Sequence, residues 1–234
     1  MRIYIDALEM VKEVERDLFE MGIRYQTETV QDQHVGDKPE FKTIELYGYT
    51  YTLKNFDKLD KMLDYMKAPI GWIQEEKYER LLDAIPANNN PGRAWKLNPE
   101  LWEKFLRDGK FSYSYAERWK EQLPYIINEL KLRPNSRQAI MTMYDRHQDM
   151  MNWGGRDRVP CSLTYQFLIR NGKLNLLYSQ RSCDFITFFT ADVYLTIALL
   201  KHVAASIGIE EGFFIHFIGS LHAFAKDLEG RNIF

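Results

Sequence analysis

The sequence has little of what marks several classes of protein. Its 234 residues include two cysteines, too few for a disulfide framework and not spaced like zinc ligands. Lys and Arg number 31 against 33 for Asp and Glu, so no basic excess favours a nucleic-acid polymer. The longest apolar run, 191–207, is interrupted by Asp192, Lys201 and His202 and should not span a bilayer. With no signal-peptide pattern at the N-terminus, we expect a reducing, cytoplasmic location and no membrane or metal.

Common catalytic motifs are absent as well. The sequence has no Walker loop, dinucleotide glycine fingerprint, GxSxG elbow or HExxH pair. These absences remove the commonest phosphate, hydride, acyl and zinc mechanisms at the level of motifs.

Helical and strand patterns are mixed without a regular alternation, a repeat or a linker. Asn171-Gly172 predicts a tight hairpin between two strands, and Gly48 indicates a bulge or close approach within another. The sequence thus predicts a single α+β domain over 1–234, with a mixed, largely antiparallel sheet and flanking helices. Helices are expected at 5–21, 56–66, 70–85, 99–109, 115–132 and 190–206, and strands at 43–53, 139–144, 162–170, 173–179 and 212–224.

The C-terminal half carries a concentration of polar residues. Cys161 precedes a strand, where a thiol can be presented, although a lone cysteine is more often an inert buried thiol. Arg181 is a candidate for the positive charge that a reactive thiolate needs. Asp192, taken alone, fits a helix N-terminal acid, and His222 alone fits a structural histidine.

Together these residues resemble the thymidylate synthase family. The resemblance rests on Cys161, Gln166, the run Gln180-Arg181-Ser182-Cys183-Asp184 and Gly219-Ser220-Leu221-His222. Within the family the sequence looks most like the bacteriophage-type deoxycytidylate hydroxymethylases. The resemblance covers about 42–222, is strongest after residue 135, and implies a thymidylate synthase-like fold.

The resemblance implies a thiolate mechanism. Cys161 would add to carbon 6 of a pyrimidine, so that carbon 5 can attack the one-carbon group of 5,10-methylenetetrahydrofolate. Arg181 and Ser182 would bind the phosphate of a nucleoside monophosphate, and Arg137 would reach it from the partner subunit of a homodimer. The remaining implied roles are substrate binding for Gln166 and His222, folate binding for Asp184 and Trp102 (or Trp95), and catalysis for Tyr115, for which a core tyrosine is the alternative.

Asp192 carries the choice of base. Thymidylate synthases have asparagine at the position that Asp192 matches in this resemblance. The amide group of asparagine can both donate to and accept from uracil. A carboxyl group can instead accept from the exocyclic amine of cytosine and bond to N3. Ser220 agrees with this choice, because synthases have aspartate there.

The family also implies a general acid or base glutamate in the N-terminal half. On the helix expected at 70–85, Glu75 shares an apolar stripe with Trp72 and Tyr78, whereas Glu76 shares a face with Arg80. An acid on an apolar stripe should have a raised pKa and suit proton relay. We therefore predict Glu75, with Glu76 as the alternative and a solvated helix face as a third interpretation.

Some positions depart from the family pattern. Gln138 replaces a second arginine, Phe224 a tyrosine that contacts the sugar, and Phe188 a glycine near the folate. Few residues follow Phe224, so we expect the long segment that closes over the site in synthases to be missing or reduced. Because water is a reactant in hydroxymethylation, this favours a hydroxymethylase.

The predicted activity is conversion of dCMP to 5-hydroxymethyl-dCMP by a transferase, in host cytoplasm if the protein is phage-encoded. A dCMP 5-methyltransferase and a thymidylate synthase are alternatives. A nucleotide-binding homologue without turnover is a further one, suggested by Gln138 and Phe224.

Overall fold

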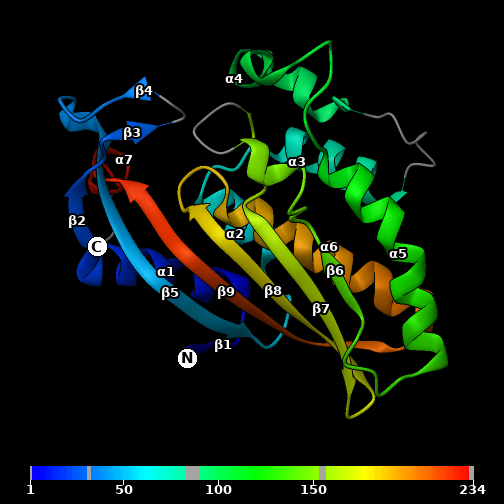
Figure 1. The fold of residues 1–234 in the computed structure, drawn as a ribbon. Coiled ribbons are helices and arrows are strands. Elements are labelled where there is room, and N and C mark those ends of the chain that lie inside the picture. Colours follow the sequence, from blue (N-terminus) through cyan, green and yellow to red (C-terminus); the bar gives the residue numbers. More distant parts are fainter. Residues whose placement is uncertain (1, 31–32, 83–89, 153–156, 232–234) are drawn as a thin grey trace.

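The computed structural model describes residues 2–30, 33–82, 90–152 and 157–231, and its main feature is a seven-stranded mixed sheet (Figure 1). The strand order is β1-β5-β9-β8-β7-β6, with β2 also paired to β5. β1 with β5 and β8 with β9 are parallel pairs, and the others are antiparallel. The strands are β1 (Arg2–Tyr4), β2 (Ile23–Gln26), β5 (Lys42–Leu53), β6 (Ile140–Thr142), β7 (Ser162–Arg170), β8 (Lys173–Asp184) and β9 (Glu210–Phe224), with a separate pair β3 (Thr29–Val30) and β4 (Gln33–His34).

Helices gather on one side of this sheet, behind it in Figure 1. The arrangement confirms the predicted α+β fold with a mixed sheet and flanking helices. The α-helices are α1 (Ala7–Met21), α2 (Leu59–Tyr65), α3 (Ile70–Lys77), α4 (Pro99–Trp102), α5 (Tyr115–Leu132), α6 (Phe189–Ile207) and α7 (Ala225–Glu229). Shorter turns are η1 (Pro39–Phe41), η2 (Tyr78–Leu82), η3 (Ala94–Leu97), η4 (Glu103–Phe105) and η5 (Asp149–Asn152).

Several elements form where local chemistry predicts them. The Asp6 carboxylate accepts from the Glu9 amide at 2.9 Å and caps α1, which ends before Gly22. Ser114 caps α5 in the same way. Asn171 and Gly172 both have positive φ, as the predicted tight hairpin requires.

Other boundaries differ from expectation. α3 ends at Lys77 and continues as the wider turn η2, and residues 83–85 of the expected helix lie outside the described part of the chain. The helix expected over 99–109 is reduced to α4 and η4. Gly48 has φ +61°, but the register of β5 against β9 is the same on both sides, so no bulge residue is inserted.

β8 is longer than predicted, and this positions the polar run of residues 180–184 within the sheet. In β8 and β9 the alternation of buried residues slips by one near Arg181 and Gly219. A Cβ on Gly219 would lie 2.8 Å from the Arg181 carbonyl oxygen, so this close approach of the two strands requires glycine. Because of this shift, the side chains of β8 near Arg181 do not alternate strictly between the two faces of the sheet, and consecutive ones can lie close together.

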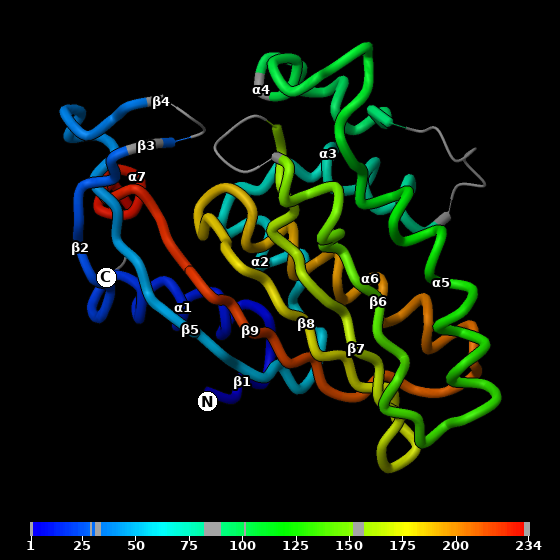
Figure 2. Tube along the Cα trace, in the orientation of Figure 1, coloured from blue at the N-terminus to red at the C-terminus, as the bar shows by residue number. Residues whose placement is uncertain are grey.

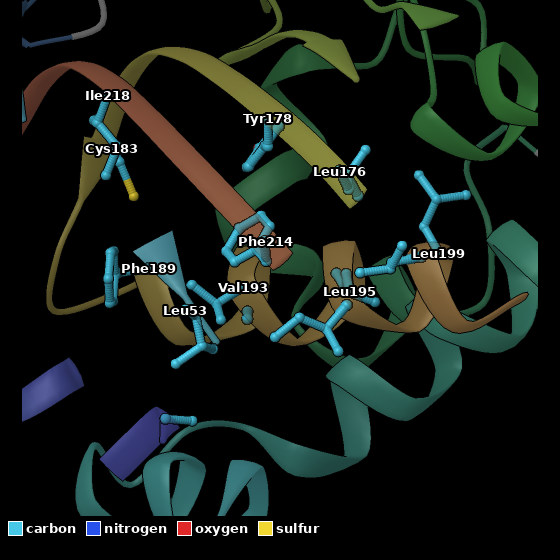
Figure 3. Packing of buried hydrophobic residues seen from close by; sticks show 14 of the residues in the cluster. Leu53, Leu176, Tyr178, Cys183, Phe189, Val193, Leu195, Leu199, Phe214 and Ile218 are labelled. Carbon is cyan, nitrogen blue, oxygen red and sulfur yellow. The ribbon is translucent and has the colours of Figure 1, made fainter. Parts of the chain in front are cut away.

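The core lies between the sheet and α6 (Figures 2 and 3). Leu176 of β8 and Phe214 of β9 face Val193 and Leu195 of α6, and all four are at most 1% exposed. By length and composition α6 could cross a membrane, but 56% of its most apolar window is buried inside the fold, as in a core helix. A smaller cluster, Trp95, Phe105 and Phe111, lies apart from this core.

Candidate active site

A cavity of about 610 Å³ opens where β7, β8 and α6 meet the helical segments. One side, the strand wall, is polar and comes from β8, the residue before β7 and the first turn of α6. The other side, the aromatic wall, comes mostly from α3, η3, α4 and η4. The strand wall consists of Cys161, Arg181, Ser182, Cys183, Asp184 and Asp192, and the aromatic wall of Trp72, Trp95, Trp102, Phe105 and Phe188.

Cys161 is held at the start of β7 by its backbone. Its carbonyl accepts from the Arg181 amide at 2.9 Å, and its own amide donates to the Tyr115 hydroxyl at 3.1 Å. Burial raises the pKa of the Cys161 thiol, and the nearby Arg181 charge opposes that rise. The thiol is therefore protonated at neutral pH in the free protein, with its activating charge already beside it.

Arg181 reaches across to the segment before β7. Its guanidinium donates to the carbonyl oxygens of Pro160 at 2.9 Å and Val159 at 3.1 Å, and Nη2 lies 3.7 Å from the Cys161 Sγ. These contacts fix a positive charge at the thiol, as a reactive cysteine requires. The side chain remains exposed enough to bind an anion as well.

Asp192 belongs to the first turn of α6, as expected for a helix N-terminal acid, and its side chain also lines the cavity. Its Oδ2 accepts from the Gln180 amide at 2.7 Å. Burial raises the pKa of Asp192 to about 6, and the hydrogen bond from Gln180 opposes the rise. The carboxyl group can therefore exchange a proton near neutral pH.

The expectation that Glu75 lies on the buried face of its helix is wrong. The Glu75 side chain is 45% exposed and pairs with Arg93 at 3.5 Å, whereas that of Glu76 is 4% exposed and accepts from Arg80 at 2.6 Å. The predicted apolar stripe contains Trp72 and Tyr78. The buried residues of α3 are instead Ile73 and Glu76. The neutralising Arg80 makes burial of an acid on that face possible.

Arg80 links this ion pair to the cavity, which it lines. Its guanidinium lies 4.5 Å from the ring centre of Tyr115 and 5.0 Å from that of Trp119, so it is sandwiched by rings of α5. The sequence places Arg80 on the same helix face as Glu76 but does not show that it reaches the cavity. Arg80 follows Glu76 by four residues, and this spacing on a helix is typical of an ion pair.

The aromatic wall is built around a second arginine that sequence reasoning missed. The Arg158 guanidinium lies 4.7 Å from the ring centres of both Trp95 and Trp102, which are 4.3 Å apart and nearly perpendicular. Phe188 lies 6.3 Å from Trp102. A flat heteroaromatic ligand fits such a surface, so these residues suit the pterin of a folate.

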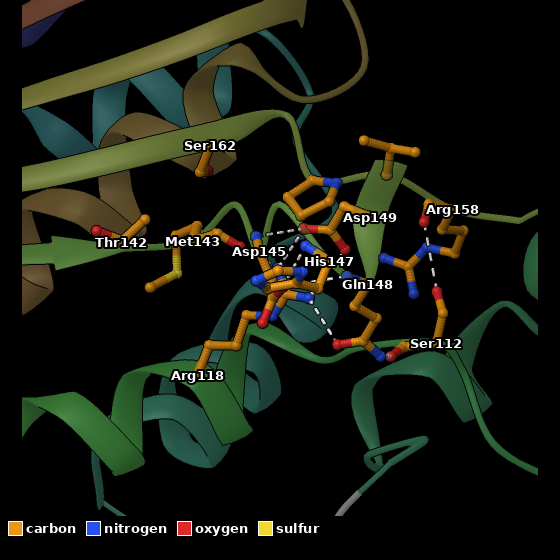
Figure 4. Close-up of polar contacts among 12 residues, drawn as sticks. Ser112, Arg118, Thr142, Met143, Asp145, His147, Gln148, Asp149, Arg158 and Ser162 are labelled. Carbon is orange, nitrogen blue, oxygen red and sulfur yellow. Dashed lines mark hydrogen bonds and ion pairs between the residues drawn. The ribbon is translucent and has the colours of Figure 1, made fainter. Parts of the chain in front are cut away.

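A polar frame supports the chain that leads to Cys161 (Figure 4). The Arg118 guanidinium makes two bonds, of 2.8 and 2.9 Å, to the buried Asp149 carboxylate. The Ser112 hydroxyl donates to the Arg158 carbonyl at 3.3 Å. The charge-assisted, bidentate contact holds Asp149 against α5, and the Ser112 hydroxyl bonds to the backbone of Arg158, which lines the cavity.

Three predicted substrate-binding residues do not line the cavity. Arg137 is exposed before β6, and its carbonyl accepts from the Gln166 amide at 3.0 Å. His222 lies on β9, where its Nδ1 is 3.4 Å from the Ser220 hydroxyl. Ser220 in turn donates to Glu45 of β5. Of the other predicted residues, those that line the cavity are Cys161, Tyr115, Arg181, Ser182, Asp184, Asp192 and Trp102.

The described residues contain no group of His, Cys, Asp and Glu side chains placed to hold a metal ion.

Comparison with known proteins identifies the family. The family model described as thymidylate synthase matches residues 78–232, which is more than half of the chain and includes both walls of the cavity except Trp72. The chain belongs to the thymidylate synthase family. This confirms the resemblance at the level of the family, but it does not distinguish the hydroxymethylases within it.

Individual members of the family agree with this assignment. A putative thymidylate synthase of Methanocaldococcus jannaschii is 34% identical over 115 residues, covering 49% of this chain and 52% of that protein. A thymidylate synthase of Oenococcus oeni is 30% identical over 54% of this chain and 44% of its own length. A putative thymidylate synthase of Methanosarcina barkeri is 28% identical over 90% of this chain and 94% of that protein. The chain thus spans about half the length of the first two relatives.

Proposed function

We propose that this protein transfers a one-carbon unit from 5,10-methylenetetrahydrofolate to carbon 5 of dCMP and forms 5-hydroxymethyl-dCMP. The observation that carries the proposal is a half-buried carboxyl, Asp192, in the same cavity as Cys161 and Arg181. Family membership supports the one-carbon chemistry, and Asp192 supports the choice of cytosine.

Cys161 is the proposed nucleophile. A phosphate bound beside Arg181 brings the pyrimidine to the thiol, and the arginine stabilises the thiolate as it forms. Addition of sulfur to carbon 6 places the electron pair on carbon 5, which then attacks the one-carbon electrophile. Carbon 5 then loses its proton, the transferred carbon separates from the folate nitrogen and gains a hydroxyl group from water, and elimination of the thiolate restores the ring.

Asp192 is the proposed reader of the base. In its protonated form the carboxyl group donates to N3 of cytosine and accepts from the exocyclic amine. The pKa of about 6 allows this form near neutral pH. Protonating N3 also helps the thiolate add to carbon 6, because the ring accepts the developing negative charge more readily.

The phosphate and sugar need further groups, and a homodimer is the proposed source. Arg137 is exposed, so it is available to a site other than that of its own chain. The helix-free side of the sheet exposes Phe213 and Phe217 of β9 to 48% and 44%, which suits burial against a second copy. In addition to Arg181, the proposed substrate-binding residues are Ser182, Gln166 and His222.

The aromatic wall and Asp184 are the proposed folate site. The cofactor supplies the one-carbon electrophile when bound. Trp102 and Trp95 offer faces and edges for a flat ring, and Asp184 accepts hydrogen bonds at the boundary between the two walls. Phe188 packs near Trp102 and completes this surface.

Glu76 replaces Glu75 as the proposed acid or base group. It is buried, it is paired with Arg80, and its charge raises the pKa of Asp192. Tyr115, whose hydroxyl accepts from two amides of the Cys161 segment, is the second proposed proton carrier. Burial raises the pKa of Tyr115, so it remains a phenol at neutral pH.

Mass spectrometry of dCMP, dUMP and CMP, each incubated with the protein and 5,10-methylenetetrahydrofolate, tests the proposal directly. We expect a hydroxymethyl product from dCMP and no rise in dihydrofolate absorbance. A methyl product with that rise would identify a methyltransferase, and turnover of dUMP in preference to dCMP would identify a thymidylate synthase, as the names of the relatives suggest. No product from any nucleotide, with binding retained, would identify a homologue without turnover.

Asp192→Asn sharpens the same experiment. The amide should lower turnover of dCMP about a hundredfold and raise that of dUMP, because it exchanges a carboxyl donor for an amide that suits uracil. An unchanged preference would remove Asp192 from base recognition.

A further inference from the structure

A buried chain of hydrogen bonds runs from β5 to the cavity. The Tyr51 hydroxyl lies 3.0 Å from Nδ1 of His216, and His216 Nε2 lies 2.8 Å from the Gln180 Oε1. The Gln180 Nε2 donates to Asp192 at 2.7 Å. Tyr51, His216 and Gln180 are 0% exposed, so water cannot replace any of these partners.

His216 can make only one of its two bonds as a donor. Burial lowers the pKa of His216 to about 3, so its ring is neutral and carries a single N–H. The ring is stacked on Tyr178 at 4.6 Å and lies nearly parallel to Phe189 at 6.2 Å, which prevents a turn of the ring. The position of one proton on this ring therefore decides the direction of the whole chain.

Two proton arrangements are consistent with the three bonds of this chain. In the first, Tyr51 donates to Nδ1, Nε2–H donates to Gln180 Oε1, and the Gln180 amino group donates to Asp192. In the second, Nδ1–H donates to Tyr51, the Gln180 amide is flipped, and its oxygen accepts a proton from Asp192. The second arrangement uses the proton of Asp192 within the protein, whereas the first leaves it for a ligand.

We propose that Tyr51 and His216 are positioning residues that hold Gln180 in the first arrangement, so that the proton and free oxygen of Asp192 face the base. The inference rests on the proposed function, because it assigns Asp192 to a pyrimidine. It extends the specificity machinery to residues of β5 and β9 that do not line the cavity.

Other charged and titratable groups also face Asp192 and have to stay constant in a test. They are the Glu76 and Arg80 pair on the α3 side and Cys183 of β8, which act on the pKa of Asp192, and Cys161 before β7 and Tyr115 of α5, whose pKa values Asp192 raises. None of these groups is hydrogen-bonded to Tyr51, although Cys183 and Asp192 both lie near enough to raise the pKa of the Tyr51 hydroxyl. The hydrogen-bonded route from Tyr51 to Asp192 runs through His216 and Gln180.

Nitrogen-15 NMR of histidine-labelled protein, without substrate, tests the arrangement. We expect His216 with Nε2 protonated, Nδ1 unprotonated and no titration between pH 5 and 8, a range around its ordinary value of about 6.5. Tyr51→Phe removes the donor to Nδ1 and should move the ring toward the other tautomer. A protonated Nδ1 in the wild-type protein would overturn the proposal without any variant.

Kinetics then test the consequence, with Tyr49→Phe as the matched control. Tyr49 is on the same strand, and its hydroxyl bonds to Asp17 and Tyr4 instead. Tyr51→Phe should lower kcat/KM for dCMP about tenfold and move the alkaline limb of the pH profile upward, because a flipped Gln180 favours the protonated form of Asp192, which is the proposed active form. Tyr49→Phe should move neither.

The outcomes separate the inference from the function on which it rests. A changed tautomer in Tyr51→Phe with an unchanged pH profile would refute the positioning role. The same would follow if both tyrosine variants lost activity equally, because that marks a loss of stability alone. Absence of dCMP turnover in the wild-type protein would instead refute the proposed function, and the tautomer measured without substrate would stand apart from it.

Discussion

The two walls of the cavity offer a ligand different kinds of contact. The strand wall places a thiol, an acid and an arginine in fixed positions through backbone and side-chain hydrogen bonds. The aromatic wall offers rings around Arg158 and few directed contacts. Directed contacts are suited to a reaction that depends on protons and angles, whereas stacked rings are suited to binding a flat group. The difference predicts that the proposed chemistry at the strand wall and the proposed cofactor binding at the aromatic wall can be separated by mutation.

The sharpest test of the strand wall is its thiol. Cys161→Ser should lower formation of product from dCMP about a thousandfold or more, because a serine hydroxyl beside Arg181 is not ionised at neutral pH. Binding of dCMP, measured by calorimetry, should change little.

Cys183→Ala provides the comparison within the same wall. Cys183 is 2% exposed and lies 3.9 Å from Asp192, with no arginine recorded against its sulfur. We expect it to lose less than about tenfold in rate. Equal losses in both variants would mean that the thiol at 161 has no special role.

Glu76 tests whether the helical side of the cavity takes part in chemistry. Glu76→Gln breaks a buried ion pair and should lower the free energy of unfolding by about 3 kcal/mol, measured by urea denaturation. The rate per folded molecule should also fall, about thirtyfold, if Glu76 moves a proton.

Glu75→Gln is the matched control, because it alters the same helix at an exposed position. It should change stability by less than about 0.5 kcal/mol and leave the rate near that of the wild-type protein. A larger rate loss in Glu75→Gln than in Glu76→Gln would restore the original choice of Glu75.

The titration of Asp192 gives a signature in stability. Its pKa is raised to about 6 in the folded protein, above the value of about 3.9 for an unfolded chain. The folded state therefore holds more protons between these values, and its stability falls as pH rises from 4 to 6. Relative to Asp192→Asn, the wild-type protein should lose up to about 3 kcal/mol over this range.

Denaturation curves of both proteins at several pH values measure this difference. Asp60→Asn, at an exposed position in α2, should follow the wild-type curve. A constant difference between wild type and Asp192→Asn from pH 4 to 7 would show that Asp192 does not titrate in this range.

Several features of the fold and of the strand wall could be predicted from the sequence. The hairpin at Asn171-Gly172, the limits of α5 and the grouping of Cys161 with Arg181 follow from turn chemistry, helix caps and family spacing. These signals are local or belong to a contiguous motif, which explains why they could be read without a structure.

The rest depended on packing between distant segments. The buried face of α3 is set by what covers it, so the apolar stripe through Trp72 misled the choice of Glu75. His216 precedes the motif Gly219–His222 without belonging to it, and the role proposed for it depends on Tyr51, which is 165 residues away in sequence. A buried hydrogen-bond chain across three strands leaves no pattern that periodicity detects.

The smallest expected effect belongs to the aromatic wall. Trp102→Ala removes a ring that packs against Trp95 and Arg158, and loss of one stacking surface should raise KM for 5,10-methylenetetrahydrofolate about tenfold. KM for dCMP and the pH profile should stay as in the wild-type protein, because the strand wall is intact. Tyr125→Ala, which removes a ring exposed to 76% on α5, is the control and should change neither constant. If Trp102→Ala instead lowered kcat with both KM values unchanged, the two walls would act as one unit, and the separation of binding from chemistry would fail.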